Sequence, residues 1–112
     1  MWLCLSDGFL SAVRHHDDPE TLVVRARAKA HLSRHFPGRK IHHSAATDYP
    51  FRVFVSRATF ACVVGRLIGA LDYGNFKASV ADDDLHDFYL RVWAAGRALE
   101  RPSRPGRPAP GA

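Results

Sequence analysis

Two short stretches of alternating residues constrain the fold of this chain more than any other feature. In residues 21–28 and 51–56, apolar side chains occupy every second position. A period of two is typical of a β-strand that buries one face and exposes the other. A shift of one residue would bury arginines in place of valines, at a high cost in desolvation. We therefore predict a sheet whose face away from the helices gathers Arg25, Arg27, Lys40, His42, Arg52 and Phe54.

The residues before and between these stretches predict three further elements. Residues 1–14 are rich in strand-forming side chains and predict one strand bent by a bulge at Asp7-Gly8, although the same pair would suit a hairpin turn. Residues 29–36 predict a short helix that ends at Pro37-Gly38. Residues 40–45 alternate again and predict another strand.

Two longer helices are predicted in the second half of the chain. Ser56 is a good N-cap for residues 57–71, whose apolar side chains recur at helical spacing. A second face of this helix consists of small residues spaced by four: Ala61, Gly65 and Gly69. Because glycine weakens a helix interior, this face predicts close packing against the final helix. That helix begins at the acids of residues 82–84, which complement its positive end.

The element order is therefore ββαββα followed by one more helix. It predicts an α+β fold, with a four-stranded antiparallel sheet and the helices packed on one face. At this length, residues 1–98 are expected to form a single compact domain. Residues 99–112 are dominated by Pro, Gly and Arg, and predict a disordered tail.

The net charge of +5 is unevenly distributed along the chain. Residues 25–66 hold nine Lys or Arg and one Asp, a net charge of +8, whereas residues 1–24 and 67–96 each carry −3. Such a basic block favours an acidic partner. Cys4 and Cys62 form no CxxC pair, and we find neither a signal peptide nor a bilayer-spanning run. We expect a cytoplasmic protein with no cofactor and no membrane contact.

A C-terminal signature carries a resemblance to other proteins. Residues 72–80, with the sequence DYGNFKASV, are followed by HDFYLRVW in residues 86–93. They resemble a small uncharacterised protein family found in bacteria and on mobile elements, as do the opening MWL, Asp7, Phe9-Leu10 and the strand Val24-Arg25-Ala26-Arg27. The resemblance covers residues 1–93. It implies one compact domain and brings no activity, cofactor or catalytic residue.

The segment between the last two helices suggests a second surface. A polar recognition patch could be formed by Tyr73, Asn75, Lys77 and His86. The alternative is a structured connector, in which Gly74 or Asn75 takes a positive-φ turn and Phe76 fills the core. In that case Ser79 or Asp82 would cap the final helix.

Catalytic chemistry is weakly indicated. His31 and His35 lie four apart and could chelate a metal, but no Cys with suitable spacing completes a site. The pair His86-Asp87 resembles the metal-binding pair of HD-type phosphohydrolases. Ser79 adds the third residue type of a hydrolytic triad, but adjacent helical residues do not face each other. A small metal-dependent hydrolase is therefore the last of three hypotheses.

Our leading hypothesis is a non-enzymatic interaction or regulatory module, for instance an inhibitor carried by a mobile element that binds a host protein complex. The partner would present an acidic protein surface to the basic sheet face. The alternative is a nucleic-acid-binding protein that uses the same face, because basic side chains beside an aromatic suit single strands.

Overall fold

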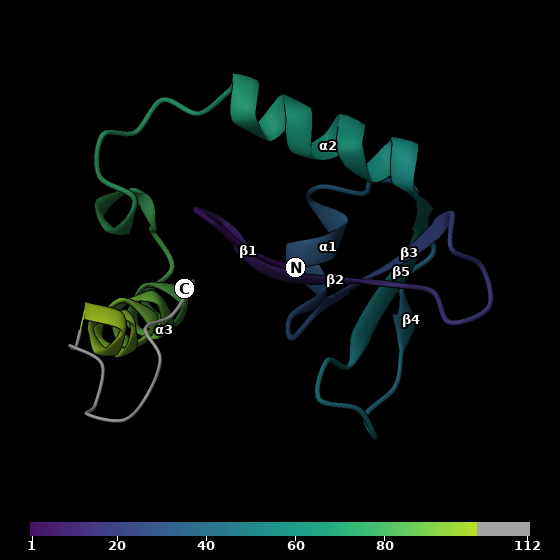
Figure 1. The fold of residues 1–112 in the computed structure, drawn as a ribbon, viewed down its shortest axis with the longest axis horizontal. Coiled ribbons are helices and arrows are strands. Elements are labelled where there is room, and N and C mark those ends of the chain that lie inside the picture. Colours follow the sequence, from purple (N-terminus) through teal and green to yellow (C-terminus); the bar gives the residue numbers. More distant parts are fainter. Residues whose placement is uncertain (101–112) are drawn as a thin grey trace, which may run out of the picture.

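A five-stranded antiparallel sheet is the centre of the computed structural model, which describes residues 1–100. The strand order is β1-β2-β3-β5-β4 (Figure 1). The strands are β1 (Trp2–Leu5), β2 (Gly8–Arg14), β3 (Thr21–Ala26), β4 (His42–His43) and β5 (Phe51–Ser56). The predicted α+β class is confirmed, but the sheet has five strands where four were predicted.

The additional strand arises because residues 1–14 form a hairpin. Leu5 pairs with Gly8, so Ser6 and Asp7 form a two-residue turn, and the bulge interpretation is wrong. Two residues that follow the first helix hold this turn: His35 Nε2 lies 2.9 Å from Asp7 Oδ1, and the Arg34 guanidinium donates to the Asp7 carbonyl. A side chain at Gly8 would meet the Cβ of His31 at 3.0 Å, so this close approach requires glycine.

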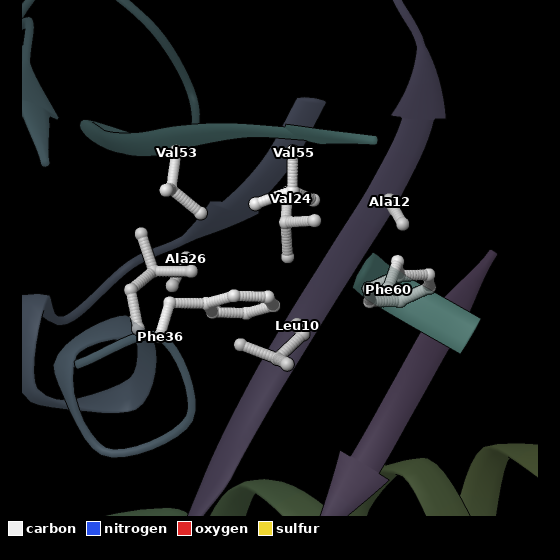
Figure 2. Packing of buried hydrophobic residues seen from close by; sticks show 9 residues of the cluster. Leu10, Ala12, Val24, Ala26, Phe36, Val53, Val55 and Phe60 are labelled. Carbon is white, nitrogen blue, oxygen red and sulfur yellow. The ribbon is translucent and has the colours of Figure 1, made fainter. Parts of the chain in front are cut away.

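Two helices, α1 (Lys29–Ser33) and α2 (Arg57–Gly69), cover one face of the sheet. Figure 2 shows side chains from β2, β3 and β5 converging with Phe36 and Phe60. The buried cluster consists of Leu10, Ala12, Val24, Ala26, Leu32, Phe36, Val53, Val55 and Phe60. Ser56 caps α2 as predicted, because its Oγ accepts the Thr59 N–H at 3.1 Å. The predicted alternation of buried valines is therefore observed.

The last helix, α3 (Asp83–Gly96), packs against the opposite face. Its Leu85 and Tyr89 join a second buried cluster with Phe9, whose side chain points away from its neighbour Leu10. The Tyr89 hydroxyl lies 2.8 Å from the Leu5 carbonyl and 2.7 Å from the Gly8 carbonyl, at the hairpin turn. The prediction that all helices share one face is wrong, since hydrophobic side chains occupy both faces of β2.

The predicted close packing of the small-residue helix face is also wrong. No atom of another segment lies within 4 Å of a Cβ placed at Gly65 or Gly69 among the described residues. Figure 1 shows α2 and α3 well separated. The two helices cannot meet because they cover different faces of the sheet.

The remaining boundaries differ modestly from the predicted ones. The 3₁₀ turns η1 (Lys77–Ser79) and η2 (Arg97–Glu100) flank α3, so Leu99 and Glu100 extend the helical region into the predicted tail. The rest of that tail lies outside the described residues. Within residues 1–100, no helix combines the length and apolar character needed to cross a bilayer.

Candidate functional site

The register of the two central strands brings two arginines together. Arg25 on β3 lies directly opposite Arg52 on β5. Both side chains point away from the core that contains Val24 and Val53. They are half-buried, because the neighbouring side chains on this face cover their stems. Like charges at directly opposite positions repel each other, so this pair costs free energy in the isolated protein.

No carboxylate compensates these two guanidinium groups in residues 1–100. The ion pairs found there involve Asp7, Asp17 and Asp87, and none reaches Arg25 or Arg52. Arg25 Nη2 donates to the Ser11 hydroxyl at 2.8 Å. The Nε atoms of Arg25 and Arg52 are buried without a hydrogen-bond partner in this part of the chain. Buried unsatisfied donors are rare, and an anionic partner at this face would satisfy the charge.

Tyr49 fixes the position of two arginines on this face. The guanidinium carbons of Arg25 and Arg27 both lie 4.7 Å from its ring centroid, within the range of cation–π attraction. Arg27 Nη1 also donates to the Asp48 carbonyl at 2.8 Å. Tyr49 is itself buried and belongs to the cluster around Phe9. The turn before β5 therefore restricts the rotamers of Arg25 and Arg27.

An aromatic group continues the face beyond Arg52. Phe54 is 39% exposed, and its ring centroid lies 5.1 Å from that of His42 and 5.7 Å from that of His15. His42 belongs to β4, which pairs with β5 beside Phe54, whereas His15 follows β2 and reaches the Phe54 ring across β3. The result is an exposed apolar spot bordered by basic or ionisable groups.

Of the six residues predicted for this face, five are brought together and one is not. Arg25, Arg27, Arg52 and Phe54 lie on or beside the β3–β5 pair, as the alternation predicts, and His42 joins them from β4. Lys40 is exposed and precedes β4, which contains only two residues where residues 40–45 were predicted. The alternation argument therefore does not place Lys40, because strand pairing begins at His42.

The predicted patch of Tyr73, Asn75, Lys77 and His86 has structural roles at several positions. The Asn75 side chain accepts the Ala78 N–H at 3.1 Å and so begins η1. Lys77 Nζ lies 4.5 Å from the Trp93 ring centroid. The Tyr73 ring packs against Phe76, with centroids 5.7 Å apart, and His86 is half-buried on α3. These contacts favour the connector alternative.

The connector differs from one of its expected details. Gly38 is the only residue with positive φ among those described, so neither Gly74 nor Asn75 adopts such a turn. Of the two expected caps of α3, Asp82 is the one observed, because its Oδ1 accepts the Leu85 N–H at 2.9 Å. The Ser79 hydroxyl instead lies 2.8 Å from that of Ser6 and ties the connector to the hairpin turn.

The histidine pair of α1 has separate structural partners. His31 Nδ1 accepts the Phe9 N–H at 3.3 Å, and burial lowers the pKa of His31 with a smaller contribution from the nearby Arg34 charge. His35 contacts Asp7. Within residues 1–100, the ligand-type groups that lie close together are His15, His16 and Asp17, in the exposed β2–β3 turn. Their contacts with one another already account for this arrangement.

Two residues of the face were not predicted from the sequence. The sequence assigns Tyr49 to a turn between strands and Ser11 to the N-terminal strand. The sequence does contain a signal for Ser11. Ser11 lies between the core residues Leu10 and Ala12, so its side chain must share the other face of the strand with Phe9. No comparable signal existed for Tyr49, because its contact with Arg25 depends on the path of an irregular loop.

Comparison with protein families, with curated proteins and with solved structures gives no match. The resemblance of the C-terminal signature to a mobile-element family therefore stays a prediction.

Proposed function

We propose that this chain is a non-enzymatic binding module whose β3–β5 face docks an acidic surface of a protein partner. The observation that carries the proposal is the cross-strand pair Arg25–Arg52, whose charges no carboxylate compensates within residues 1–100. A carboxylate of the partner would accept hydrogen bonds from the guanidinium groups and relieve their repulsion. By binding in this way, the chain would regulate or inhibit a protein complex.

The flanking groups support a protein partner. Phe54 offers an apolar contact beside Arg52, and mixed apolar and arginine contacts are typical of hot spots in protein interfaces. His42 and His15 lie against the Phe54 ring in T-shaped arrangements. Their imidazole N–H groups can donate hydrogen bonds to acidic side chains of a partner beside this apolar spot.

Nucleic-acid binding on the same face is the second candidate. It is supported by the exposure of Phe54 directly beyond a row of arginines. On a single strand, each phosphate contact changes the logarithmic salt dependence of binding by about 0.7. This dependence provides a measurement that separates the two candidates.

The test measures binding of fluorescent poly-glutamate and of a single-stranded oligonucleotide by anisotropy over a series of salt concentrations. Arg52→Gln removes a charge whose side chain makes no hydrogen bond in the described structure. Arg39→Gln, on the exposed loop after α1, is the matched control with the same change in net charge. We expect Arg52→Gln to weaken poly-glutamate binding several-fold more than Arg39→Gln.

Two other outcomes are informative. Tighter binding of the oligonucleotide, with a salt slope that Arg52→Gln lowers by about 0.7, would establish the second candidate. Equal effects of the two substitutions on both probes would show that the β3–β5 face binds neither class of anion. If Arg52→Gln has the larger effect, pull-down from the native host with wild-type and Arg52→Gln protein identifies the partners that depend on this face.

A further inference from the structure

The outer edge of β1 has hydrogen-bonding groups directed away from the sheet. Met1 and Ala12 exchange two backbone hydrogen bonds of 2.8 Å, so the hydrogen-bonded pairs of this hairpin continue with Leu3–Leu10 and Leu5–Gly8. The alternate residues Trp2 and Cys4 therefore direct their N–H and C=O groups outward. No segment within residues 1–100 donates to or accepts from these groups.

An apolar cleft lies on each side of this edge. Towards α2, Leu3 and Leu5 face Leu67, Ile68 and Leu71 across a cleft of about 410 Å³. Towards α3, Cys4 faces Tyr89, Val92 and Trp93 across a cleft of about 310 Å³. An added strand would project alternate side chains into the two clefts, which is the geometry of β-strand addition.

The side chains around this edge leave a large apolar area in contact with water. The exposed fractions are 65% for Met1, 67% for Trp2, 67% for Ile68, 55% for Leu71, 40% for Val92 and 56% for Trp93. These fractions correspond to roughly 700 Å² per molecule, close to the ~800 Å² that each partner buries in a stable interface of standard size.

The edge also lacks the charge, proline and irregular pairing that keep many sheet edges unpaired. Natural edge strands are often protected by lysine, proline or bulges. The sequence of β1, WLCL, contains no charge and no proline, and its pairing with β2 is regular. The other edge, β4, is only two residues long and consists of His42 and His43. The two edges of the sheet therefore differ, and β1 is the one suited to pairing.

We propose that β1 pairs antiparallel with β1 of a second copy of this chain, forming a symmetric dimer with a continuous ten-stranded sheet. The outward groups restrict the register, since the residues that face outward must pair with each other, and the register centred on Leu3 engages both Trp2 and Cys4 of each copy. With the two-fold axis at Leu3, Trp2 of each copy lies opposite Cys4 of the other and forms the hydrogen-bonded pairs. Leu3 faces Leu3 of the other copy across a non-hydrogen-bonded pair.

Charge and position are compatible with this dimer. The β1 edge belongs to the first 24 residues, which carry a net charge of −3, so dimerisation does not bring two basic blocks together. The Arg25–Arg52 face lies two strands away from this edge and stays accessible in both copies. The proposal does not depend on the function of that face.

The first test measures mass by sedimentation equilibrium from low to high micromolar protein. We expect the wild-type chain to dimerise. Cys4→Pro removes an outward N–H while leaving the Leu3–Leu10 and Leu5–Gly8 bonds intact, and it should weaken the dimer about tenfold or more. Trp2→Lys is a second variant that protects the edge by charge. Circular dichroism at low concentration checks that both variants fold.

The second test reads the register directly. In a Cys4→Ser, Cys62→Ser background, Leu3→Cys should form an interchain disulfide under mild oxidation, because the opposed Cα atoms would lie about 4.5 Å apart. A chain that retains only Cys62, exposed on α2, is the control and should not cross-link. A monomeric wild-type chain at all concentrations overturns the proposal. A dimer that Cys4→Pro and Trp2→Lys leave unchanged, or one without the Leu3→Cys cross-link, overturns it equally.

Discussion

Removing one hydroxyl tests how α3 is attached to the sheet. Tyr89 is 3% exposed, and its hydroxyl contacts the carbonyls of Leu5 and Gly8 at 2.8 and 2.7 Å. Burial raises the pKa of Tyr89 well above its ordinary value, so the hydroxyl keeps its proton and acts as the donor. Tyr89→Phe deletes this donor and keeps the ring between Phe76 and Phe88.

The expected loss follows from the hydrogen-bond geometry. A hydrogen bond of this kind contributes about 0.5–1.5 kcal/mol net, and an unsatisfied buried group costs about 1–3 kcal/mol. The Leu5–Gly8 strand pair continues to occupy both carbonyls, so the loss should lie near the overlap of these ranges, at about 1.5 kcal/mol. In a domain of this size, the midpoint of thermal unfolding should then fall by about 6–12 °C.

Thermal and urea unfolding of Tyr89→Phe and of Tyr73→Phe provide the measurement. The Tyr73 hydroxyl makes no hydrogen bond among the described residues, so its removal should change stability by less than about 0.5 kcal/mol. Equal effects of the two substitutions would refute the reasoning, since they would mean that the hydroxyl does not anchor α3 to the hairpin turn.

Three further predictions concern the helices and the hairpin. Gly65→Ala should raise the free energy of unfolding by about 1 kcal/mol, because the helix gains propensity and its Cβ meets open space; an unfolding midpoint at or below that of the wild type would contradict this. Gly8→Ala should lower the same free energy by about 1–3 kcal/mol, because its Cβ would lie 3.0 Å from that of His31. Stability should fall as the pH drops below about 6.5, since the lowered pKa of His31 makes the unfolded chain bind more protons. His31→Gln should reduce this dependence, whereas His16→Gln, in the exposed β2–β3 turn, is the control.

The buried face of the sheet could be predicted because the alternation of residues within each strand is enough to identify it. Val24 and Val53 alternate with arginines that cannot be buried without partners, so only one strand phase is acceptable. Alternation does not distinguish a hairpin from a bent strand in residues 1–14, because side chains alternate between the two faces in both structures. The hairpin is held by the contact of His35, which follows α1, with Asp7 in the turn, and this contact joins residues 28 positions apart.

The placement of α3 could not be predicted, because both faces of β2 are apolar. Phe9 and Leu10 are both buried, and nothing in their local pattern shows which one meets a helix that begins 73 residues later. The glycines of α2 were misleading for the same reason. Their spacing suits close packing, but the helix that could fill the space crosses to the other face, where it meets Phe9.

The three arginines of the candidate site are not equivalent, although the sequence presents them as one set. Arg25 and Arg27 stack on Tyr49, and Arg25 also bonds Ser11, so replacing either one disturbs the packing of a buried ring as well as the charge of the face. Arg52 has no such contact within residues 1–100, and it repels Arg25 across the strand pair. Its substitution therefore removes a charge that the proposed acidic partner would bind and relieves a repulsion at once. A variant that becomes more stable while losing its affinity for acidic probes would identify Arg52 as a residue retained for binding, at a cost to the fold.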